Sequence, residues 1–452
     1  MDMPPYVKTV MDRMTQAGWQ CFLVGGCVRD SLLGRTPQDY DLTTDARPEQ
    51  VMELFGTEAT GTGLRHGTVT IKTEEGTVEM TTFRQEGSYS DNRHPDSVTF
   101  IHDVTEDLAR RDFTINAMAY SPAAGVVDPF GGQQDLARGL VRAVGDPERR
   151  FTEDALRMVR AHRFAARYDF QIEEKTRAAI DRCQPLIAHV AVERLYKEWM
   201  EILRVKPAQI AEMTGLFAPW LPELEVSLHT PQNSPYHYTD VLHHILDSIS
   251  YLDPFDETLA LTLLLHDLGK PACRTTSESG RDHFSNHPVA GEQIARRVVQ
   301  DLKLSNRQKQ MIPALVRHHD DVLPMTPKAI YHFRIEKGWS HEMMESLFRV
   351  QYCDIMAHSP AGRKRLDRWA RSRAYYEAQC QFRPLSYQQL AVSGHDIVAF
   401  TGLRNKQIHR ALDAVLRMCF FEPEKNDRLS ILTFVLKNQA KFAREDTEWS
   451  GS

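Results

Sequence analysis

Two aspartates separated by one residue are the first side chains whose spacing suggests chemistry. Asp39 and Asp41 close the stretch "GGCVRDSLLGRTPQDYDL" at 25–42. Residues i and i+2 of a strand point to the same face, so we expect the two carboxylates side by side, where their charges repel. A divalent cation removes this repulsion, and carboxylates with substrate phosphates commonly hold Mg²⁺ at phosphoryl-transfer sites. The pair predicts a Mg²⁺ site, and Glu79 is either a third oxygen ligand or an exposed strand acid.

A pair of glycines opens the same stretch. Gly25 and Gly26 follow the strand-like run "CFLV" and precede a predicted helix. Because glycine has no Cβ, backbone N–H groups can approach a phosphate closely, and a helix N-terminus favours negative charge. A tight turn that needs glycine is the alternative. Arg29 is a further phosphate-binding candidate.

The elements that position these residues form a strand-containing head. Helical spacing of apolar residues covers 6–17, and strand patterns follow at 21–24, 67–73 and 77–83. From Phe151 onward, apolar residues recur at helical periods. The fold class is therefore an α/β head with a small mixed sheet, followed by a mainly all-α neck, body and tail. Breaker-rich stretches at 231–240 and 380–394 mark connections, and the expected domains are 1–140, 141–215, 216–370 and 371–452.

The motif "EDALR" at 153–157 carries an acid and a base that can recognise a nucleobase. Asp154 and Arg157 are three residues apart on a predicted helix, so an ordinary ion pair is one interpretation. A carboxylate accepts hydrogen bonds while a guanidinium donates them. Cytosine and adenine each present an amino donor beside a ring-nitrogen acceptor, and uracil and guanine present the reverse. The pair can therefore accept C and A and reject U and G.

The run from Gly25 to Asp41 resembles the G-G-x-V-R-D and D-x-D signature of class II template-independent nucleotidyltransferases, which include CCA-adding enzymes and bacterial poly(A) polymerases. The likeness covers residues 20–200 and extends to "TTFRQEGSYSDNRHPDSVTF", "RRDFTINAMAY", "DPFGG", "EDALR" and "ERLYKEW". The resemblance implies a nucleotidyltransferase palm in the head, with Asp154 and Arg157 as an amino-acid template.

The resemblance also implies a reaction and its partners. The 3′-hydroxyl of a tRNA, activated by Mg²⁺ on Asp39 and Asp41, would displace pyrophosphate from CTP twice and then from ATP. Segment 83–100, rich in Gly, Ser, Asp, Asn and Pro, is expected to be a mobile loop without regular structure, needed for the switch to ATP. The predicted nucleotide-binding residues are Gly25, Gly26, Arg29, Arg111, Asp112, Asp154, Arg157, Arg160 and Arg163, with Arg110 as a further cation and with Thr114 and Asn116 as structural residues.

Histidines and aspartates in the second half of the chain predict another metal site. The motif "LLLHDLGKP" is preceded by His243 and His244, and it is followed by two more histidine-containing stretches and by "QYCDIMAHSP". Their order resembles the HD phosphohydrolase superfamily, whose His and Asp side chains hold one or two metals that activate water. Imidazole with carboxylate suits a divalent transition metal. The predicted ligands are His244, His266, Asp267, His287, His319 and Asp354, with His243 and His318 as alternatives to their neighbours; a retained fold without turnover is the other interpretation.

From about residue 385, the sequence resembles the tRNA-binding tail of CCA-adding enzymes. Arg404, Lys406 and Arg410 form a basic cluster able to meet phosphates, although a solvated helix face is the alternative. Asn405 and His409 stand where the family has a glycine-containing turn and I-G, which departs from the pattern. The sequence predicts no oligomeric state.

Composition places few further limits. The chain has 452 residues, 42% of them hydrophobic and 26% charged, which is ordinary globular usage. The net charge of −6 does not indicate a general nucleic-acid binder. Seven cysteines without a C-x-x-C pair favour a reducing cytoplasm. The first 18 residues lack an apolar signal core, and no run is long enough for a membrane span.

The preferred function is therefore CCA addition to tRNA. A poly(A) polymerase or A-adding enzyme of the same class is the nearest alternative. A metal phosphohydrolase whose head merely binds RNA, and a non-catalytic RNA-binding protein, are the others.

Overall fold

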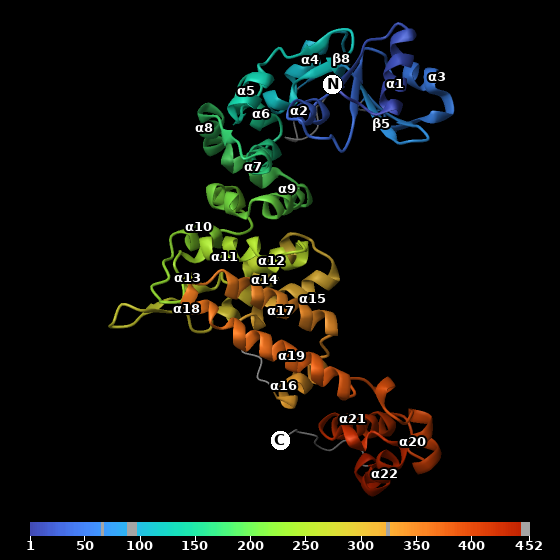
Figure 1. Cartoon of the computed structure of the whole chain (residues 1–452), viewed down its shortest axis with the longest axis vertical. Helices are drawn as coiled ribbons and strands as arrows, with labels where there is room; N and C mark the ends of the chain where they lie inside the picture. Colours follow the sequence, from blue (N-terminus) through green and yellow to red (C-terminus); the bar gives the residue numbers. More distant parts are fainter. Residues whose placement is uncertain (65–66, 88–96, 322–325, 444–452) are drawn as a thin grey trace. The chain divides into compact units, whose positions relative to one another are not determined.

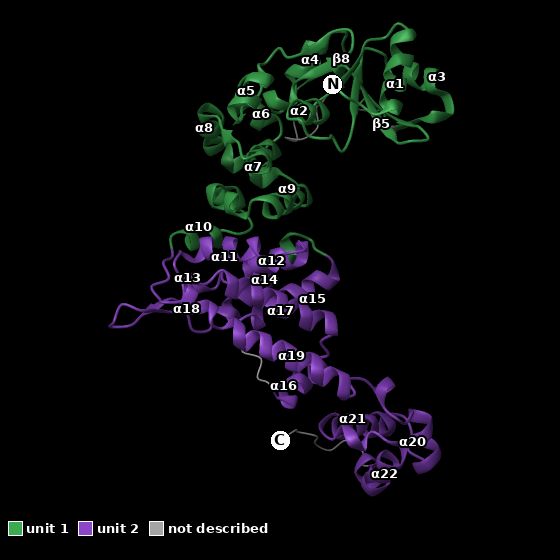
Figure 2. Ribbon diagram, in the orientation of Figure 1, with its two compact units in different colours: residues 1–229, 297–304 green, residues 230–296, 305–452 purple. Residues whose placement is uncertain are grey.

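The chain folds into two compact units, coloured green and purple in Figure 2. The structure, a computed structural model, describes residues 1–64, 67–87, 97–321 and 326–443. Unit 1 holds residues 1–229 and 297–304, and unit 2 holds residues 230–296 and 305–452. The break after His229 lies beside the predicted connection at 231–240. The finer boundaries of the four expected domains stay predictions.

Unit 1 is built on a mixed sheet with the strand order β3-β4-β5-β2-β1-β8-β9. Its strands are β1 (Cys21–Val24), β2 (Asp41–Thr44), β3 (Ala59–Gly63), β4 (Thr68–Lys72), β5 (Thr77–Thr82), β8 (Ala119–Ser121) and β9 (Gly125–Val127). β2 and β5 run parallel, whereas the other paired strands are antiparallel. Alternate residues of β4 and β5 are buried, as the period of a half-buried strand requires. The three strand predictions in the head are confirmed.

Helices surround this sheet and extend beyond it (Figure 1). They are α1 (Pro5–Gln16), α2 (Gly26–Leu32), α3 (Pro48–Phe55), α4 (Val104–Ala109), α5 (Gly132–Arg138), α6 (Pro147–Glu153), α7 (Leu156–Tyr168), α8 (Glu174–Cys183), α9 (Val192–Val205) and α10 (Glu223–Leu228). Short 3₁₀ turns cover Gly56–Glu58, Thr114–Asn116, Gln184–His189, Pro207–Glu212 and Thr214–Phe217. A two-stranded parallel sheet joins β10 (Leu140–Val141) to β11 (Gln171–Ile172). The predicted change to helical structure after Phe151 is confirmed.

The expectation that segment 83–100 has no regular structure is wrong at both of its ends. β6 (Arg84–Glu86) and β7 (Val98–Phe100) pair antiparallel, with Arg84 opposite Phe100. The Phe83 side chain is buried against Phe22 of β1, which holds the base of this hairpin to the sheet. Residues 88–96, the centre of the predicted loop, lie outside the described residues.

Unit 2 is helical. Its helices are α11 (Val241–Ser250), α12 (Glu257–Leu265), α13 (Lys270–Cys273), α14 (His287–Asp301, of which 297–301 belong to unit 1), α15 (Asn306–His318), α16 (Pro327–Tyr331), α17 (His341–Met356), α18 (Pro360–Arg363), α19 (Leu366–Phe382), α20 (Gly394–Thr401), α21 (Lys406–Phe421) and α22 (Arg428–Ala443). Single turns cover His332–Glu336, Tyr387–Gln389 and Pro423–Lys425, and β12 (Thr275–Thr276) pairs with β13 (Asp282–His283). All but two residues of α12 are buried, which explains its apolar run "LALTLLL". Residues 383–393, without a long helix, match the predicted second connection.

The carboxyl-terminal helices share a small core of their own. Ile397 of α20, Val415 of α21 and Val435 of α22 are fully buried in it. Asn405, which stands at the departure from the family pattern, has a positive φ of 48° just before α21. Its ψ of −123° lies outside the left-handed helical region that asparagine tolerates, and glycine adopts this combination most easily, so the turn keeps a glycine-type conformation without a glycine.

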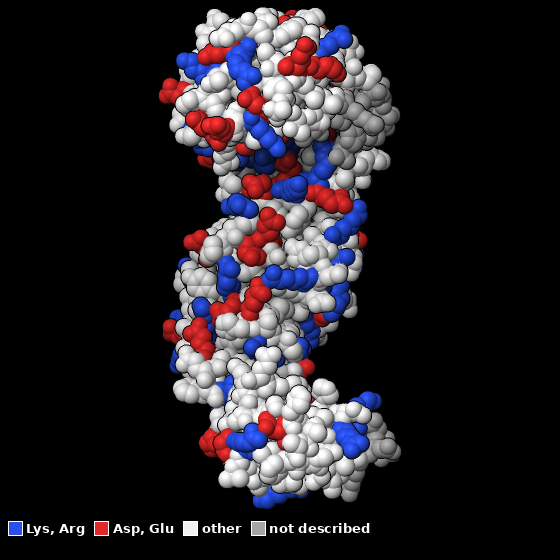
Figure 3. All heavy atoms as spheres, turned by 90° about the vertical axis from the view of Figure 1, so that its right-hand side faces the viewer, with Lys and Arg blue, Asp and Glu red and all other residues white. Residues whose placement is uncertain are grey.

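Basic and acidic side chains are interspersed on the face shown in Figure 3. This face therefore carries no single-sign field, in agreement with the modest net charge of −6. Among the described helices, none combines the length and apolar character needed to cross a bilayer.

Candidate nucleotide site and metal centre

Three acids gather at one edge of the sheet in unit 1. Asp41 is the first residue of β2 and lies in register with Glu79 of the parallel strand β5. Asp39 precedes the strand, so the expectation that both aspartates belong to one strand is wrong. Burial, and then the charge of Glu79, raises the pKa of Asp41; Asp39 adds to the rise and Arg111 opposes it. This surplus of negative charge favours a divalent cation.

Arg111 lies beside the glycine turn and 3.6 Å from Asp107, and its charge also acts on Asp41. Gly25 has a φ of 76°, and a Cβ on it would come within 3.0 Å of Arg111 Nη1. Glycine is thus required both by the backbone conformation and by the close approach of the guanidinium. The buried Nε of Arg111 has no hydrogen-bond partner among the described residues. An incoming anionic oxygen would satisfy this donor. Gly26 begins α2.

Asp112 is the centre of a hydrogen-bonded network beside this turn. Its Oδ2 accepts bonds from Arg160 Nε at 2.9 Å and Nη2 at 2.6 Å, and its Oδ1 accepts one from Asn116 Nδ2 at 3.0 Å. Although burial alone would raise it, the Arg160 charge and the Asn116 bond hold the pKa of Asp112 at about 2. Arg29 is 5% exposed and donates to Asn116 and Asp30. Its predicted phosphate contact stays a prediction.

The expectation that Asp154 and Arg157 share one helix is wrong. Asp154 has extended backbone angles (φ −147°, ψ 103°) after the end of α6, whereas Arg157 lies in the first turn of α7. Asp154 accepts bonds from Arg194 at 2.7 and 3.3 Å. The Arg157 guanidinium donates instead to Glu153 Oε2 at 2.8 Å and to the carbonyl oxygens of Arg150 and Arg110. Each group is therefore oriented by its own partner.

Two residues of α9 complete this cluster and were not predicted as site residues. Arg194 holds Asp154, and Glu198 lies 2.6 Å from Arg163 Nε and 3.7 Å from Arg160 Nη1. Both belong to the motif "ERLYKEW", and their spacing of four residues places them on one face of the helix. That spacing is the signal that could have identified them.

Buried histidines and aspartates form the second candidate site, entirely within unit 2. His244, His266, Asp267 and Asp354 offer ligand atoms that lie within 4.8 Å of one another. His244 Nε2 lies 2.9 Å from Asp354 Oδ1, and His266 Nε2 lies 3.2 Å from Asp267 Oδ2. Asp267, His287 and His319 form a second such group.

The Asp267 carboxylate is shared between the two groups. Its Oδ1 faces His287 Nε2 at 3.2 Å and His319 Nε2 at 3.5 Å, while its Oδ2 faces His244 and His266. Both oxygens are buried and accept no hydrogen bond from the described residues. The Lys270 ammonium, 2.6 Å from Oδ2, is their nearest cation. A carboxylate with one oxygen in each group can bridge two metal ions.

Backbone contacts fix which nitrogen of each histidine is free. The Nδ1 atoms of His266, His287 and His319 lie 2.6 to 2.8 Å from carbonyl oxygens three residues earlier. A carbonyl oxygen only accepts, so each Nδ1 carries a proton, and in the neutral ring that metal binding requires, Nε2 has the lone pair. The Nε2 atoms of His287 and His319 are only 3.3 Å apart. At this distance the two nitrogens either share a proton in a hydrogen bond or hold a cation between them, and with both Nε2 atoms unprotonated the arrangement fits a metal ion.

The two histidine alternatives are separated by burial. His244 is 1% exposed and lies in the cluster, whereas His243 is exposed and contacts Asp240. His319 lies in the cluster, whereas His318 contacts Asp321. Metal binding by any of these residues stays a prediction.

Burial and the neighbouring charges strongly shift the pKa values of the histidines and aspartates in this cluster. Burial alone would raise the pKa of Asp267, but the charges of His266 and Lys270 hold this pKa well below its usual range. Although burial opposes the shift, Asp267 raises the pKa of His266 to about 10, while burial lowers that of His244 to about 4. The two carboxylates are therefore ionised, as metal ligands must be.

A cavity of about 400 Å³ opens onto this cluster. It is lined by Asp267, His287, His319 and Asp354 and by the basic side chains Lys270, Arg281 and Arg365. His237 and His358 also line it and were not predicted as ligands. His358 is four residues after Asp354, which is the signal that could have found it; His237 lies in an irregular segment without such a signal.

Three family models match successive parts of the chain. The Poly A polymerase head domain matches residues 21–142, the probable RNA and SrmB-binding site of polymerase A matches 169–228, and the HD domain matches 236–356. The first match contains the acids of the sheet edge, the second contains Arg194 and Glu198 of α9, and the third contains the predicted metal ligands of unit 2.

Curated relatives and a solved structure agree with these matches. The chain is 49% identical over 193 residues to the CCA-adding enzyme of Lactobacillus helveticus, covering 43% of this chain and 48% of the relative. It is 43% identical over 227 residues to that of Geobacillus kaustophilus, covering 49% and 56%. The chain thus spans about half the length of these curated relatives. The Bacillus stearothermophilus CCA-adding enzyme, solved with CTP, aligns with a TM-score of 0.71 at 28% identity over 97% of this chain and 99% of that one.

These findings define the class as a polymerase-type nucleotidyltransferase head joined to a helical body with an HD domain. The chain belongs to the tRNA nucleotidyltransferase and bacterial poly(A) polymerase family.

Proposed function

We propose that this protein adds CCA to the 3′ end of tRNA, using CTP, ATP and Mg²⁺. The observation that carries the proposal is the edge of the sheet, where Asp41 lies opposite Glu79, together with the buried Nε of Arg111, which has no hydrogen-bond partner among the described residues. Acids for a metal and a donor for a phosphate thus lie together. Relatives named CCA-adding enzymes, one of them solved with CTP, support the same reaction.

The three acids suit Mg²⁺, which prefers carboxylate oxygens together with substrate phosphates. Bound there, Mg²⁺ would supply Lewis-acid activation of the attacking 3′-hydroxyl. Burial, and then the like charge of Glu79, raises the pKa of Asp41, and such an ion would offset that like charge.

Arg111 is assigned to the triphosphate, because its guanidinium lies beside the glycine turn and interacts electrostatically with Asp41 as well as with Asp107. Asp112 is assigned to the ribose hydroxyl. Its carboxylate is held ionised at a pKa of about 2 by Arg160 and Asn116, so it remains an acceptor at neutral pH.

Base selection is assigned to Asp154 and Arg157. Arg194 orients the Asp154 carboxylate, and Glu153 orients the Arg157 guanidinium. A cytosine or adenine edge would find one acceptor and one donor, whereas a uracil or guanine edge would leave buried polar groups unpaired. Arg163, on the same helix as Arg157, is paired with Glu198.

The carboxyl-terminal helices are assigned to tRNA. Arg404 and Lys406 flank the positive-φ residue Asn405 at the start of α21, where phosphates could meet them. The free cysteines suit a reducing compartment, and we assign the protein to the cytoplasm.

The test is stepwise extension of a tRNA that lacks its 3′ CCA. CTP alone should add two cytidines, and ATP should then add one adenosine and stop. A poly(A) polymerase would instead add a run of adenosines without CTP. Asp39→Ala should abolish extension, whereas unchanged extension by this variant would refute the assignment of the metal site.

A second activity, hydrolysis of a phosphate ester, is favoured by the cavity of unit 2. Its buried ligand groups lie beside Lys270, Arg281 and Arg365, which can hold an anionic substrate. His266→Ala should remove release of phosphate from a nucleoside monophosphate while CCA addition persists. His243→Ala, an exposed neighbour of His244, is the matched control and should retain both activities. Hydrolysis by His266→Ala at the native rate would contradict this proposal.

A further inference from the structure

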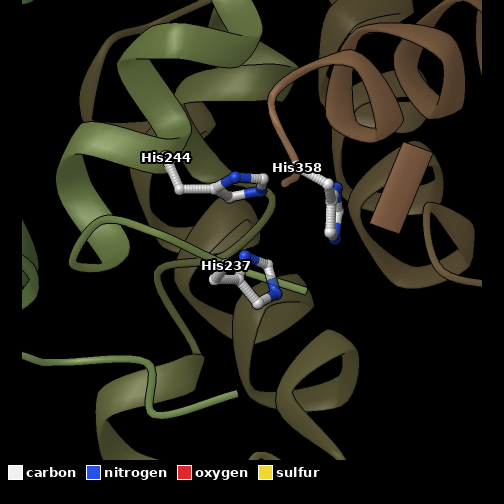
Figure 4. Close-up of side chains that lie close together, drawn as sticks. All are labelled: His237, His244 and His358. Carbon is white, nitrogen blue, oxygen red and sulfur yellow. The ribbon is translucent and has the colours of Figure 1, made fainter. Parts of the chain in front are cut away.

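Three histidines gather beside the two metal-ligand groups of unit 2. His237 comes from the irregular segment before α11, His244 from α11 and His358 from the segment after α17 (Figure 4). Their ring centroids are 4.8 Å apart for His237 and His244, 4.4 Å for His237 and His358, and 4.9 Å for His244 and His358. Each ring offers a nitrogen within 4.8 Å of the nitrogens of the other two.

His358 makes a backbone contact like those of His266, His287 and His319. Its Nδ1 lies 2.7 Å from the carbonyl oxygen of Asp354. That oxygen only accepts, so Nδ1 carries the proton and Nε2 keeps a free lone pair. A second-sphere bond of this kind fixes the tautomer and ring orientation of metal-binding histidines. His358 is therefore prepared as a ligand, although the motif-based prediction omits it.

His237 supplies a second unused nitrogen. Its Nδ1 is buried and has no hydrogen-bond partner among the described residues. A buried polar atom left unpaired costs about 1–3 kcal/mol, so a native structure that keeps one calls for a partner that the protein itself does not supply. Both His237 and His358 line the cavity, so an ion arriving from solvent can reach them.

We propose that His237, His244 and His358 form a further transition-metal site at the wall of the cavity. Three imidazoles and an open position make a donor set that suits zinc and neighbouring transition metals better than magnesium or calcium. Asp354 supplies compensating charge, because its Oδ1 lies 3.6 Å from His358 Nδ1 and 2.9 Å from His244 Nε2. The site differs from the two predicted groups in one decisive respect: it does not use Asp267.

His244 belongs both to this site and to the group with His266 and Asp354. The two places for an ion therefore compete for one imidazole. Removing Asp267, which serves both predicted groups, should leave the three-histidine site as the strongest remaining place for a metal.

The test is titration of the full-length protein with Co²⁺ and Zn²⁺ in an Asp267→Asn background. Calorimetry gives the number of ions, and the visible absorption of Co²⁺ reports its ligand geometry. We expect one ion in Asp267→Asn. We expect none when His358→Ala or His237→Ala is added, and one again when His283→Ala, an exposed cavity residue, is added as the matched control.

An ion that survives both His237→Ala and His358→Ala would overturn the proposal, as would absence of any ion in Asp267→Asn. Circular dichroism and urea unfolding monitor the folding of each variant. If Asp267→Asn does not fold, His358→Ala in the otherwise native chain is compared instead. An unchanged Co²⁺ spectrum there would refute the site, and a changed one would support it. The readout is metal binding, so it is independent of both proposed activities.

Discussion

Replacement of Arg157 by alanine gives the sharpest view of how protein side chains alone could select a base. The Arg157 guanidinium is held by the Arg150 carbonyl at 3.1 Å, Glu153 Oε2 at 2.8 Å and the Arg110 carbonyl at 3.2 Å. These contacts fix its direction without satisfying all five of its N–H donors. We expect Arg157→Ala to admit UTP and GTP while tRNA binding persists.

The magnitude follows from the groups left unpaired. A uracil in the native site would present a donor to Arg157 and an acceptor to Asp154, and each mismatch costs about 1–3 kcal/mol. Removal of Arg157 cancels one of the two mismatches, so discrimination of CTP against UTP should fall by a factor of about 5 to 150. Glu153 keeps Arg150 at 2.7 Å, so the variant should lose only about 1 kcal/mol of folding stability.

Single-turnover incorporation of each nucleotide into a tRNA lacking CCA measures this ratio. Arg149→Ala is the matched control, because Arg149 contacts the same Glu153 from the solvent side with a side chain that is 73% exposed. The control should keep native selectivity. If Arg157→Ala lowers incorporation of all four nucleotides equally, the assigned role in base selection is wrong.

Three further substitutions test residues that stabilise the nucleotide site or the fold around it. Burial lowers the pKa of His162 to about 4, so its stabilising effect is complete above pH 6.5 and is lost as pH falls towards 4; His162→Gln should remove about 3 kcal/mol of that pH dependence in urea unfolding. Arg160→Ala should lower the free energy of unfolding by about 3 kcal/mol, because Asp112 stays buried without its partner; native stability would contradict this. Gly25→Ala should raise the KM for CTP by displacing Arg111, and an unchanged KM would argue against that contact.

The sequence predicted those strands of the fold whose burial follows a regular local pattern of apolar residues. The buried run at Cys21–Val24 and the alternating run at Thr77–Thr82 form strands as expected, because burial on one or both faces leaves a direct trace in the sequence. The pairing of β2 with β5, which brings Glu79 opposite Asp41, depends on chain topology. Sequence alone offered Glu79 only as one of two interpretations.

The errors and the open alternatives depended on backbone angles, on contacts between residues distant in sequence, and on burial, which local sequence patterns do not show. Asp154 ends α6 with extended angles, although helical spacing placed it with Arg157. The ends of the 83–100 segment form a hairpin because Phe83 packs against Phe22, a contact between residues distant in sequence. Burial likewise separated His244 from His243, which identical adjacent residues could not reveal.

The most direct test of the central claim is the rate of first cytidine addition as Mg²⁺ is varied. The account predicts that Asp41→Ala lowers this rate about a thousandfold or more at every Mg²⁺ concentration, as loss of several kcal/mol of transition-state stabilisation requires. Glu79→Gln should raise the Mg²⁺ concentration needed for half-maximal rate, and Asp12→Ala, an exposed acid on α1, should change neither. Cytidine addition by folded Asp41→Ala at the native rate would contradict the account.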